Sequence, residues 1–164
     1  MVKEVSSITH AHFRSVFACF VYIVYAIEIL KENNKEDAYD KMRVIVNQFL
    51  SNKDFNQAEI GLFDRILKND IHTLKESEIA SSGYVLHSLE ASIWCVLTSS
   101  SYGETVLKAV NLGGDTDTTA AIAGGLAGLI YGYEAIPKGW LEVLARKNDI
   151  ENLCNRMAER YSID

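Results

Sequence analysis

Two aspartates and a threonine stand close together after a pair of glycines, in the stretch L-G-G-D-T-D-T-T. Asp115, Asp117 and Thr118 offer two carboxylates and a hydroxyl, the hard oxygen ligands that Mg²⁺, Mn²⁺ and Ca²⁺ prefer. Within a regular helix, side chains two positions apart point about 200° away from each other. The carboxylates can therefore meet at one ion only if the turn over Gly113–Thr116 is not helical, and its glycines make such a turn accessible. The spacing predicts a divalent-metal site at the start of a helix.

Helix capping is the alternative explanation for the same residues. Asp115 is of a residue type favoured at the N-cap, and Asp117 in the first turn suits the positive end of the helix dipole. If capping is their only role, D-T-D-T begins a helix and binds no ion. The residues by themselves leave both explanations open.

The helix that follows carries a small residue at every fourth position, at Ala120, Gly124, Gly128 and Gly132. Such a ridge allows another helix to approach closely. Since glycine costs about 1 kcal/mol relative to alanine inside a helix, the repeat indicates a packing requirement. We expect a buried central helix whose ridge packs against the two most apolar helices of the chain, over 11–31 and 85–97.

Apolar residues recur at helical spacing along most of the chain, and no sustained alternation typical of strands is present. This predicts a single all-α domain over residues 1–164, with a compact, orthogonal arrangement of helices. The stretch Asp70–Ser81 lacks the pattern and is expected to be a long connection. The expected helices span about Ala11–Lys31, Asp37–Leu50, Asn56–Lys68, Val85–Leu97, Glu104–Ala109 and Ile150–Tyr161, with another beginning at Ile136-Pro137.

Charge and composition exclude several classes of protein. The formal net charge of −6 and the isoelectric point of about 5.2 argue against general binding to nucleic acid or to a membrane surface. The apolar run Val16–Ile27 is far shorter than the roughly 20 residues that span a bilayer. Three scattered cysteines without a C-x-x-C motif indicate reduced thiols in a cytoplasmic protein.

Two further groups of residues precede expected helices and could contact a ligand. His10 and His12 lie at a helix start, where imidazoles and backbone N–H groups can bind an anion. Gly83 lets backbone approach a ligand, and Tyr84 can stack on a base or a sugar. The alternative is an ordinary surface or loop role for each. His87 and Glu90, one turn apart on the next helix, are expected to pair with each other or to lie on the surface.

Three stretches together resemble the ADP-ribosylglycohydrolase family: I-T-H at Ile8–His10, S-G-Y-V-L-H-S-L-E-A at Ser82–Ala91, and L-G-G-D-T-D-T-T-A-A-I-A-G at Leu112–Gly124. The last is highly specific, and the other two occur in the family's order and spacing. The resemblance implies an all-α fold, two bound Mg²⁺ ions (Mn²⁺ in some members), and hydrolysis of the bond that joins ADP-ribose to an acceptor. An ADP-ribosylated protein or an ADP-ribose-containing small molecule would be the partner.

The resemblance also assigns roles to residues that match the family's motifs. It implies that Asp115, Asp117 and Thr118 are metal ligands. His10 matches a position that contacts ADP-ribose, and Gly83 with Tyr84 falls in a loop that lines the ligand cleft. It assigns no role to His12, His87 or Glu90, and it leaves the catalytic residue unknown.

The chain departs from the family's pattern at its N-terminal side. Family members begin with a glycine-rich segment and a T-D-D motif, which supply the remaining metal ligands and the catalytic carboxylate, and neither motif occurs here. The resemblance thus covers the C-terminal portion of the fold, incomplete at the N-terminus. We expect a hydrolase fragment with little turnover as an isolated chain, completed by the missing N-terminal half. The alternatives are a non-catalytic helical remnant that self-associates and an unrelated protein in which D-T-D-T only caps a helix.

Overall fold

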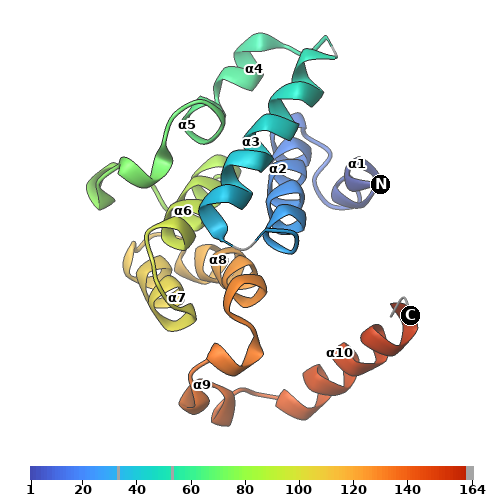
Figure 1. The fold of residues 1–164 in the computed structure, drawn as a ribbon, viewed down its shortest axis with the longest axis vertical. Helices are drawn as coiled ribbons and strands as arrows, with labels where there is room; N and C mark the ends of the chain where they lie inside the picture. Colours follow the sequence, from blue (N-terminus) through green and yellow to red (C-terminus); the bar gives the residue numbers. More distant parts are fainter. Residues whose placement is uncertain (33, 53, 162–164) are drawn as a thin grey trace.

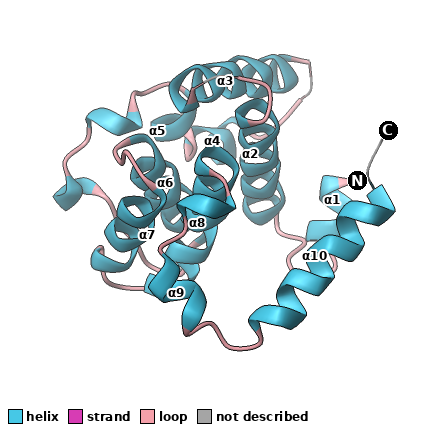
Figure 2. Ribbon diagram, turned by 60° about the horizontal axis from the view of Figure 1, so that its bottom comes forward, coloured by secondary structure: helices cyan, strands magenta, loops and turns pink. Residues whose placement is uncertain are grey.

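The computed structural model describes residues 1–32, 34–52 and 54–161, and the regular structure within these ranges is helical throughout (Figure 1, Figure 2). The all-α prediction is therefore confirmed. Within the same ranges, no helix combines the length and the apolarity needed to cross a membrane. The elements are α1 (Val2–Ser6), α2 (Phe13–Ile29), α3 (Lys35–Ser51), α4 (Gln57–Gly61), α5 (Asp64–Leu67), η1 (Ile71–Thr73), η2 (Glu76–Glu78), α6 (Val85–Leu97), α7 (Tyr102–Asn111), α8 (Thr116–Tyr131), η3 (Tyr133–Ala135), α9 (Lys138–Glu142) and α10 (Lys147–Tyr161).

Helix α6 is the centre of the core. Every residue of α6 except Val85 and His87 is buried, as expected of a helix that is apolar nearly all round. It packs against α2, α7 and α8, which lie on different sides of it. Its bounds are those predicted from the sequence. Because α6 is packed on several sides, its two ends are held in place. The loops attached to these ends therefore start from fixed positions.

Two lysines stabilise the C-terminal end of α6. The Lys35 ammonium donates to the carbonyl of Val96 at 2.9 Å and also to that of Ser99, and Lys108 donates to the carbonyl of Thr98 at 2.5 Å. Helix C-termini leave carbonyl groups unpaired and favour positive charge. Burial lowers the pKa of Lys35. The carbonyl oxygens replace the water molecules that its ammonium group loses on burial.

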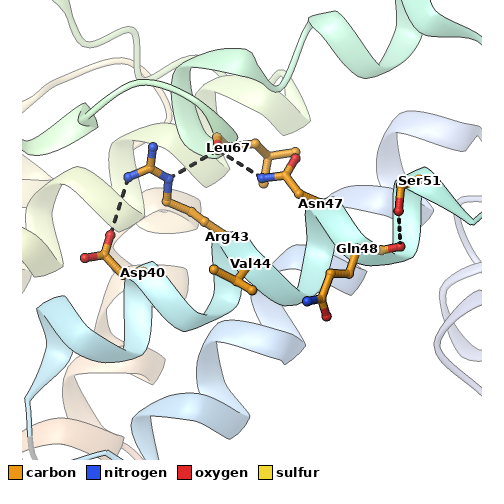
Figure 3. Close-up of a pocket in the computed structure, with 7 residues that line it drawn as sticks. All are labelled: Asp40, Arg43, Val44, Asn47, Gln48, Ser51 and Leu67. Atoms are coloured by element: carbon orange, nitrogen blue, oxygen red, sulfur yellow. Dashed lines mark hydrogen bonds and ion pairs between the residues drawn. The ribbon is translucent and has the colours of Figure 1, made fainter.

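A similar arrangement ends helix α5. The guanidinium of Arg43 donates to the carbonyls of Leu67 and Lys68 at 3.2 and 2.9 Å, and the Asn47 amide donates to Leu67 at 3.3 Å. Figure 3 shows these side chains reaching from α3 across a shallow surface hollow toward Leu67. Their polar groups are engaged in holding α3 to α5, so this hollow is a consequence of packing.

Helix α2 is shorter than predicted and less completely buried. It begins at Phe13 because the His12 side chain serves as its N-cap and accepts the amide hydrogen of Arg14 at 3.2 Å. Its inward face packs in the core, where the rings of Phe17 and Phe63 meet edge to face with centroids 4.7 Å apart. Ile23 and Ile27 on the opposite face are exposed, so α2 has one open apolar side.

The single helix predicted over Asn56–Lys68 is wrong, because the chain there forms two short helices. Asn56 caps α4 with its side chain, as the Ala58 amide donates to it at 3.0 Å, and α4 ends at Gly61, a poor helix former. The chain then turns at Phe63, whose ring is fully buried. Burying this ring takes precedence over continuing the helix.

The prediction that α8 is a buried helix with a ridge of four small residues is also corrected. Only one face of α8 is buried, and α8 packs chiefly against α7 and α6. Gly132 ends the helix with φ +78°, and a methyl group on Gly128 would meet open space. The closest approach is instead at Gly125, where a Cβ would lie 2.6 Å from the Tyr22 hydroxyl of α2.

Helices α9 and α10 contain no buried residue, and α10 stands away from the bundle formed by α2–α8 (Figure 1). The terminal amphipathic helix predicted over Ile150–Tyr161 is confirmed, and it begins slightly earlier, at Lys147. Its apolar residues, among them Leu153 and Met157, are exposed. This arm therefore contributes nothing to the core.

Gly125 and Gly128 give a matched test of the packing of α8. Gly128→Ala should stabilise the fold by up to about 1 kcal/mol, because alanine is the better helix former and the added methyl group meets nothing. Gly125→Ala should leave the protein at least about 1 kcal/mol less stable than Gly128→Ala, since the methyl group displaces the Tyr22 hydroxyl from the carbonyl of Ile122. Urea denaturation followed by circular dichroism measures both. Equal stabilities would contradict the close approach of α2 and α8.

Candidate functional site

The turn before α8 is not helical, as the proposed sharing of one ion by two carboxylates requires. Gly113 and Gly114 have φ of +76° and +64°, and Asp115 has φ −90° and ψ 72°. Helix α8 begins only at Thr116. The Asp115 side chain makes no capping hydrogen bond, so simple capping does not account for this aspartate.

The two carboxyl groups of the turn lie within hydrogen-bond reach of each other. Hydrogen bonds with the Asp115 side chain, and with the backbone amides of Asp117 and Thr118, lower the pKa of Asp117. Two carboxylates at this separation repel unless a proton or a cation lies between them. The arrangement can therefore hold a positive ion, with the Thr118 hydroxyl next along the chain.

A loop distant in sequence is bound to this turn through Ser81. The Asp115 amide donates to the Ser81 carbonyl at 2.8 Å, and the buried Ser81 hydroxyl is within reach of the carbonyls of Leu112 and Gly113, at 3.2 and 2.9 Å. A Cβ on Gly114 would lie 2.6 Å from the Ser81 carbonyl oxygen. The second glycine is thus needed both for its backbone angles and for this contact. Sequence reasoning missed Ser81, because a serine ahead of a helix carries no distinctive signal.

Gly83 and Asp115 touch directly. A Cβ on Gly83 would lie 2.8 Å from the Asp115 carboxylate oxygen Oδ2, closer than a real Cβ can approach. A glycine at position 83 leaves space for the Asp115 carboxylate, which any larger side chain would displace. The residue expected to line a ligand cleft and the residue expected to bind metal are thus brought together, although the sequence places them on different segments.

A cleft of about 1040 Å³ opens beside this contact, between α1, α2, the start of α6 and α8. His10, Gly83, Tyr84 and Thr118 all line it. Its remaining wall is largely apolar, and within the part of the chain that the structure describes no aspartate or glutamate lines it. Asp115 is reached through Gly83, at the edge of the cleft rather than in its wall.

Of the two histidines predicted at a helix start, His12 lies there and His10 does not. His10 lies in the turn between α1 and α2, where its amide donates to the Ser6 carbonyl at 2.8 Å, and its side chain lines the cleft. His12 is the N-cap of α2 and also lines the cleft. Helix α1, which was not predicted from the sequence, supplies part of the cleft wall.

The expected pairing of His87 with Glu90 is wrong. Glu90 is buried and faces Arg65 at 3.5 Å, and burial raises the pKa of its carboxyl group. The His87 ring nitrogen Nδ1 lies 2.7 Å from the Ser82 hydroxyl, and its ring stands edge-on to that of Tyr84. His87 thus supports the cleft, while Glu90 belongs to the core.

An ion pair at the rim of the cleft was also missed from the sequence. Arg14 makes a two-pronged contact with the Glu59 carboxylate at 2.7 and 2.9 Å, and its third nitrogen donates to the Tyr84 hydroxyl at 3.0 Å. The three residues come from distant segments. Only the fold brings them together, so no local pattern could have identified them.

Among the described residues, no group of three or more histidine, cysteine, aspartate or glutamate side chains is placed to surround a metal ion. Asp115 and Asp117 are therefore not joined by a third such side chain at this turn, and Thr118 adds a hydroxyl. Mg²⁺ takes six oxygen ligands, so about half of its shell would come from water or from groups outside these three residues.

Comparison with known proteins identifies relatives of this chain. The sequence profile of the ADP-ribosylglycohydrolase family matches residues 1–163. The ADP-ribosylarginine hydrolase Tri1 of Serratia proteamaculans is 45% identical over 83 residues, which are 51% of this chain and 23% of the relative. The ADP-ribosyl-[dinitrogen reductase] glycohydrolase of Rhodospirillum rubrum is 38% identical over 71 residues, covering 43% of this chain and 24% of the relative.

The similarity extends to animal proteins at a lower level. The ADP-ribosylhydrolase ARH3 of Bos taurus is 34% identical over 88 residues, covering 46% of this chain and 24% of the relative. The aligned part of this chain thus spans about a quarter of the length of each of these curated relatives.

Gly113 and Gly114 give a matched test of how the loop is bound to the turn. Gly114→Ala should destabilise the fold by about 1–3 kcal/mol more than Gly113→Ala, because both have positive φ but only the methyl group at position 114 collides with the Ser81 carbonyl. Thermal unfolding of the two variants measures the difference. Equal melting temperatures would show that loop and turn are not in contact.

Proposed function

Because this chain belongs to the ADP-ribosylglycohydrolase family, we propose that it forms the metal- and ADP-ribose-binding side of a hydrolase that releases ADP-ribose from a modified acceptor. The contact between Gly83 and the Asp115 carboxylate carries the proposal. It places an open cleft for an organic ligand directly beside two carboxylates that can bind a cation. A helix cap alone would need no such neighbour.

We assign the metal to Asp115, Asp117 and Thr118, with Mg²⁺ as the first choice and Mn²⁺ as the alternative. The donors are carboxylate and hydroxyl oxygens, which suit these hard ions. A hydrogen bond with the Asp115 side chain lowers the pKa of Asp117, which supports two neighbouring carboxyl groups. When bound, the ion supplies Lewis-acid chemistry by drawing electrons from the substrate oxygens that it contacts. A second ion, which the family resemblance implies, would need ligands beyond these three residues.

The other residues of the site bind and orient the ligand. Gly83 leaves room for the Asp115 carboxylate, Tyr84 offers an aromatic face to a base or a sugar, and His10 presents an imidazole to the cleft. The apolar walls exclude water from a bound ligand. We propose an ADP-ribosylated protein or an ADP-ribose-containing small molecule as the substrate, since relatives are named as hydrolases of ADP-ribosylarginine and of ADP-ribosylated dinitrogen reductase.

We assign no catalytic acid or base to this chain. No carboxylate lines the cleft among the described residues. Two carboxylates on neighbouring helices are engaged elsewhere, Glu59 by Arg14 and Glu90 by Arg65. General acid–base catalysis requires a group within hydrogen-bond reach of the proton that moves. The missing carboxylates would come from protein outside these 164 residues, as the family resemblance implies. We propose that the site works in the cytoplasm, where the free thiols of Cys19, Cys95 and Cys154 stay reduced.

A non-catalytic helical remnant that self-associates is the second candidate. The exposed Ile23 and Ile27 of α2 and the exposed apolar residues of α10 favour it, because unpartnered apolar surface commonly marks an interface. Such a remnant would keep the fold without any dependence on metal.

Replacing the two aspartates tests the metal assignment. Asp115→Asn and Asp117→Asn should each lower the affinity of the 164-residue chain for Mn²⁺ at least about tenfold, since even residues outside the ligand shell commonly cost that much. Asp149→Asn is the matched control, as Asp149 is an exposed aspartate of α10 paired with Arg146. Titration followed by electron paramagnetic resonance of free Mn²⁺ measures the affinities.

Unchanged Mn²⁺ affinity in both variants would contradict the metal assignment and favour the alternative that D-T-D-T only caps a helix. The same preparation should release little ADP-ribose from an ADP-ribosylated protein, because the cleft lacks a carboxylate to move protons. Mg²⁺-dependent release well above the uncatalysed rate would show that a catalytic group has been overlooked.

A further inference from the structure

The rim of the cleft is built around one arginine that joins three segments. Arg14, in the first turn of α2, holds Glu59 of α4 with two nitrogens, Nε at 2.7 Å and Nη2 at 2.9 Å. Its remaining nitrogen, Nη1, donates to the hydroxyl of Tyr84 at 3.0 Å. Tyr84 is the N-cap residue of α6 and lines the cleft. The arginine therefore connects the outer helices to an aromatic ring of the candidate site.

The geometry defines what Arg14 can do. Two parallel contacts to one carboxylate are the strongest and most directional form of an arginine–carboxylate pair. This pair lowers the pKa of Glu59 and raises that of Arg14, so both groups are charged at neutral pH. With its charge matched by Glu59, Arg14 is a poor anchor for a phosphate, and its remaining contact is the one to Tyr84.

Tyr84 is also held by His87 and Ser82. The His87 ring meets the Tyr84 ring edge to face, with centroids 5.1 Å apart and an interplanar angle of 88°. His87 is in turn fixed by the Ser82 hydroxyl at 2.7 Å, and the same hydroxyl accepts the Tyr84 amide hydrogen at 3.3 Å. The tyrosine is thus held at its hydroxyl, at its ring and at its backbone, although 38% of its surface is exposed.

We propose that Arg14 and Glu59 are positioning residues that hold Tyr84 as a fixed aromatic wall for the base of a bound adenine nucleotide. The inference rests on the proposed function, because ADP-ribose is the ligand that supplies the base. A ring already held in place loses no rotamer freedom when a base stacks on it, whereas a free tyrosine on the rim would have to be ordered at the moment of binding. The ion pair acts on the ligand only through Tyr84.

Two probes separate the base from the rest of the ligand. Adenosine 5′-monophosphate contains the base, and ribose 5-phosphate lacks it. Arg14→Met, which removes both contacts, should weaken binding of adenosine 5′-monophosphate about five- to tenfold, near the low end of what losing a stacked aromatic costs. Binding of ribose 5-phosphate should change by less than about twofold, since no stacked base is lost. Glu59→Gln should follow Arg14→Met in the same direction, and Arg14→Lys should fall between Arg14→Met and the wild type.

Arg146→Met is the matched control, because Arg146 forms an equally short pair with Asp149 on the exposed arm of the protein. In a Tyr84→Ala background, Arg14→Met should cause no further loss. A loss that persists in that background, or that is equal for both probes, would show that Arg14 contacts the ligand directly and would overturn the proposal.

A measurement without ligand keeps the proposal separate from the proposed function. Nuclear magnetic resonance of ring-labelled tyrosine, with the Tyr84 signals assigned by Tyr84→Phe, reports whether the ring is held. The signals should move toward those of a free tyrosine in Arg14→Met and Glu59→Gln but not in Arg146→Met. Signals that stay in place would overturn the positioning role. If the signals move but the wild type binds neither probe, the positioning role stands and the nucleotide assignment falls.

Discussion

One backbone hydrogen bond, from the Asp115 amide to the Ser81 carbonyl, is the constraint on which the candidate site depends. It can form only because Gly114 has no side chain and adopts a positive φ, which brings the turn against the loop that precedes α6. Once the two segments are joined, Gly83 must lie against the Asp115 carboxylate and Tyr84 must face the cleft. The positions of the predicted ligand and metal residues relative to one another follow from this junction.

The rest of the helical bundle holds in place the two segments joined by this hydrogen bond, the loop before α6 and the turn before α8. Helix α6 is buried along almost its whole length and is closed at its C-terminal end by Lys35 and Lys108, so the loop at its other end starts from a fixed point. Helix α8 is fixed against α2 where Gly125 meets the Tyr22 hydroxyl. A site assembled from two loops can be rigid only if the helices that carry them are, and here the core supplies that rigidity.

The sequence predicted what depends on local pattern and missed what depends on contact between distant segments. The bounds of α6 followed from apolar periodicity. The directions of Asp115 and Asp117 gave a non-helical turn before α8 as the condition for sharing one ion, and the turn meets this condition. The break at Phe63 and the close approach at Gly125 did not follow from such patterns, because burial of one ring and proximity of one hydroxyl override helix propensity and spacing. The contacts of Ser81 and of the Arg14–Glu59–Tyr84 group could not be predicted from the sequence either, since each joins segments with no shared pattern.

We propose that metal and ADP-ribose bind to one connected site, and titration of ADP-ribose with and without Mn²⁺ distinguishes this from two independent sites. Two coupled ligands change each other's affinity by the same factor, and a cation that contacts the ligand's oxygens should strengthen its binding. The wild-type chain should therefore bind ADP-ribose at least about fivefold more tightly when Mn²⁺ is present. Gly83→Ala, whose methyl group would displace the Asp115 carboxylate, should abolish that gain, whereas Gly139→Ala, where a methyl group meets nothing, should retain it. Equal ADP-ribose affinity with and without Mn²⁺ in the wild type would contradict the account and favour a helical remnant without this function.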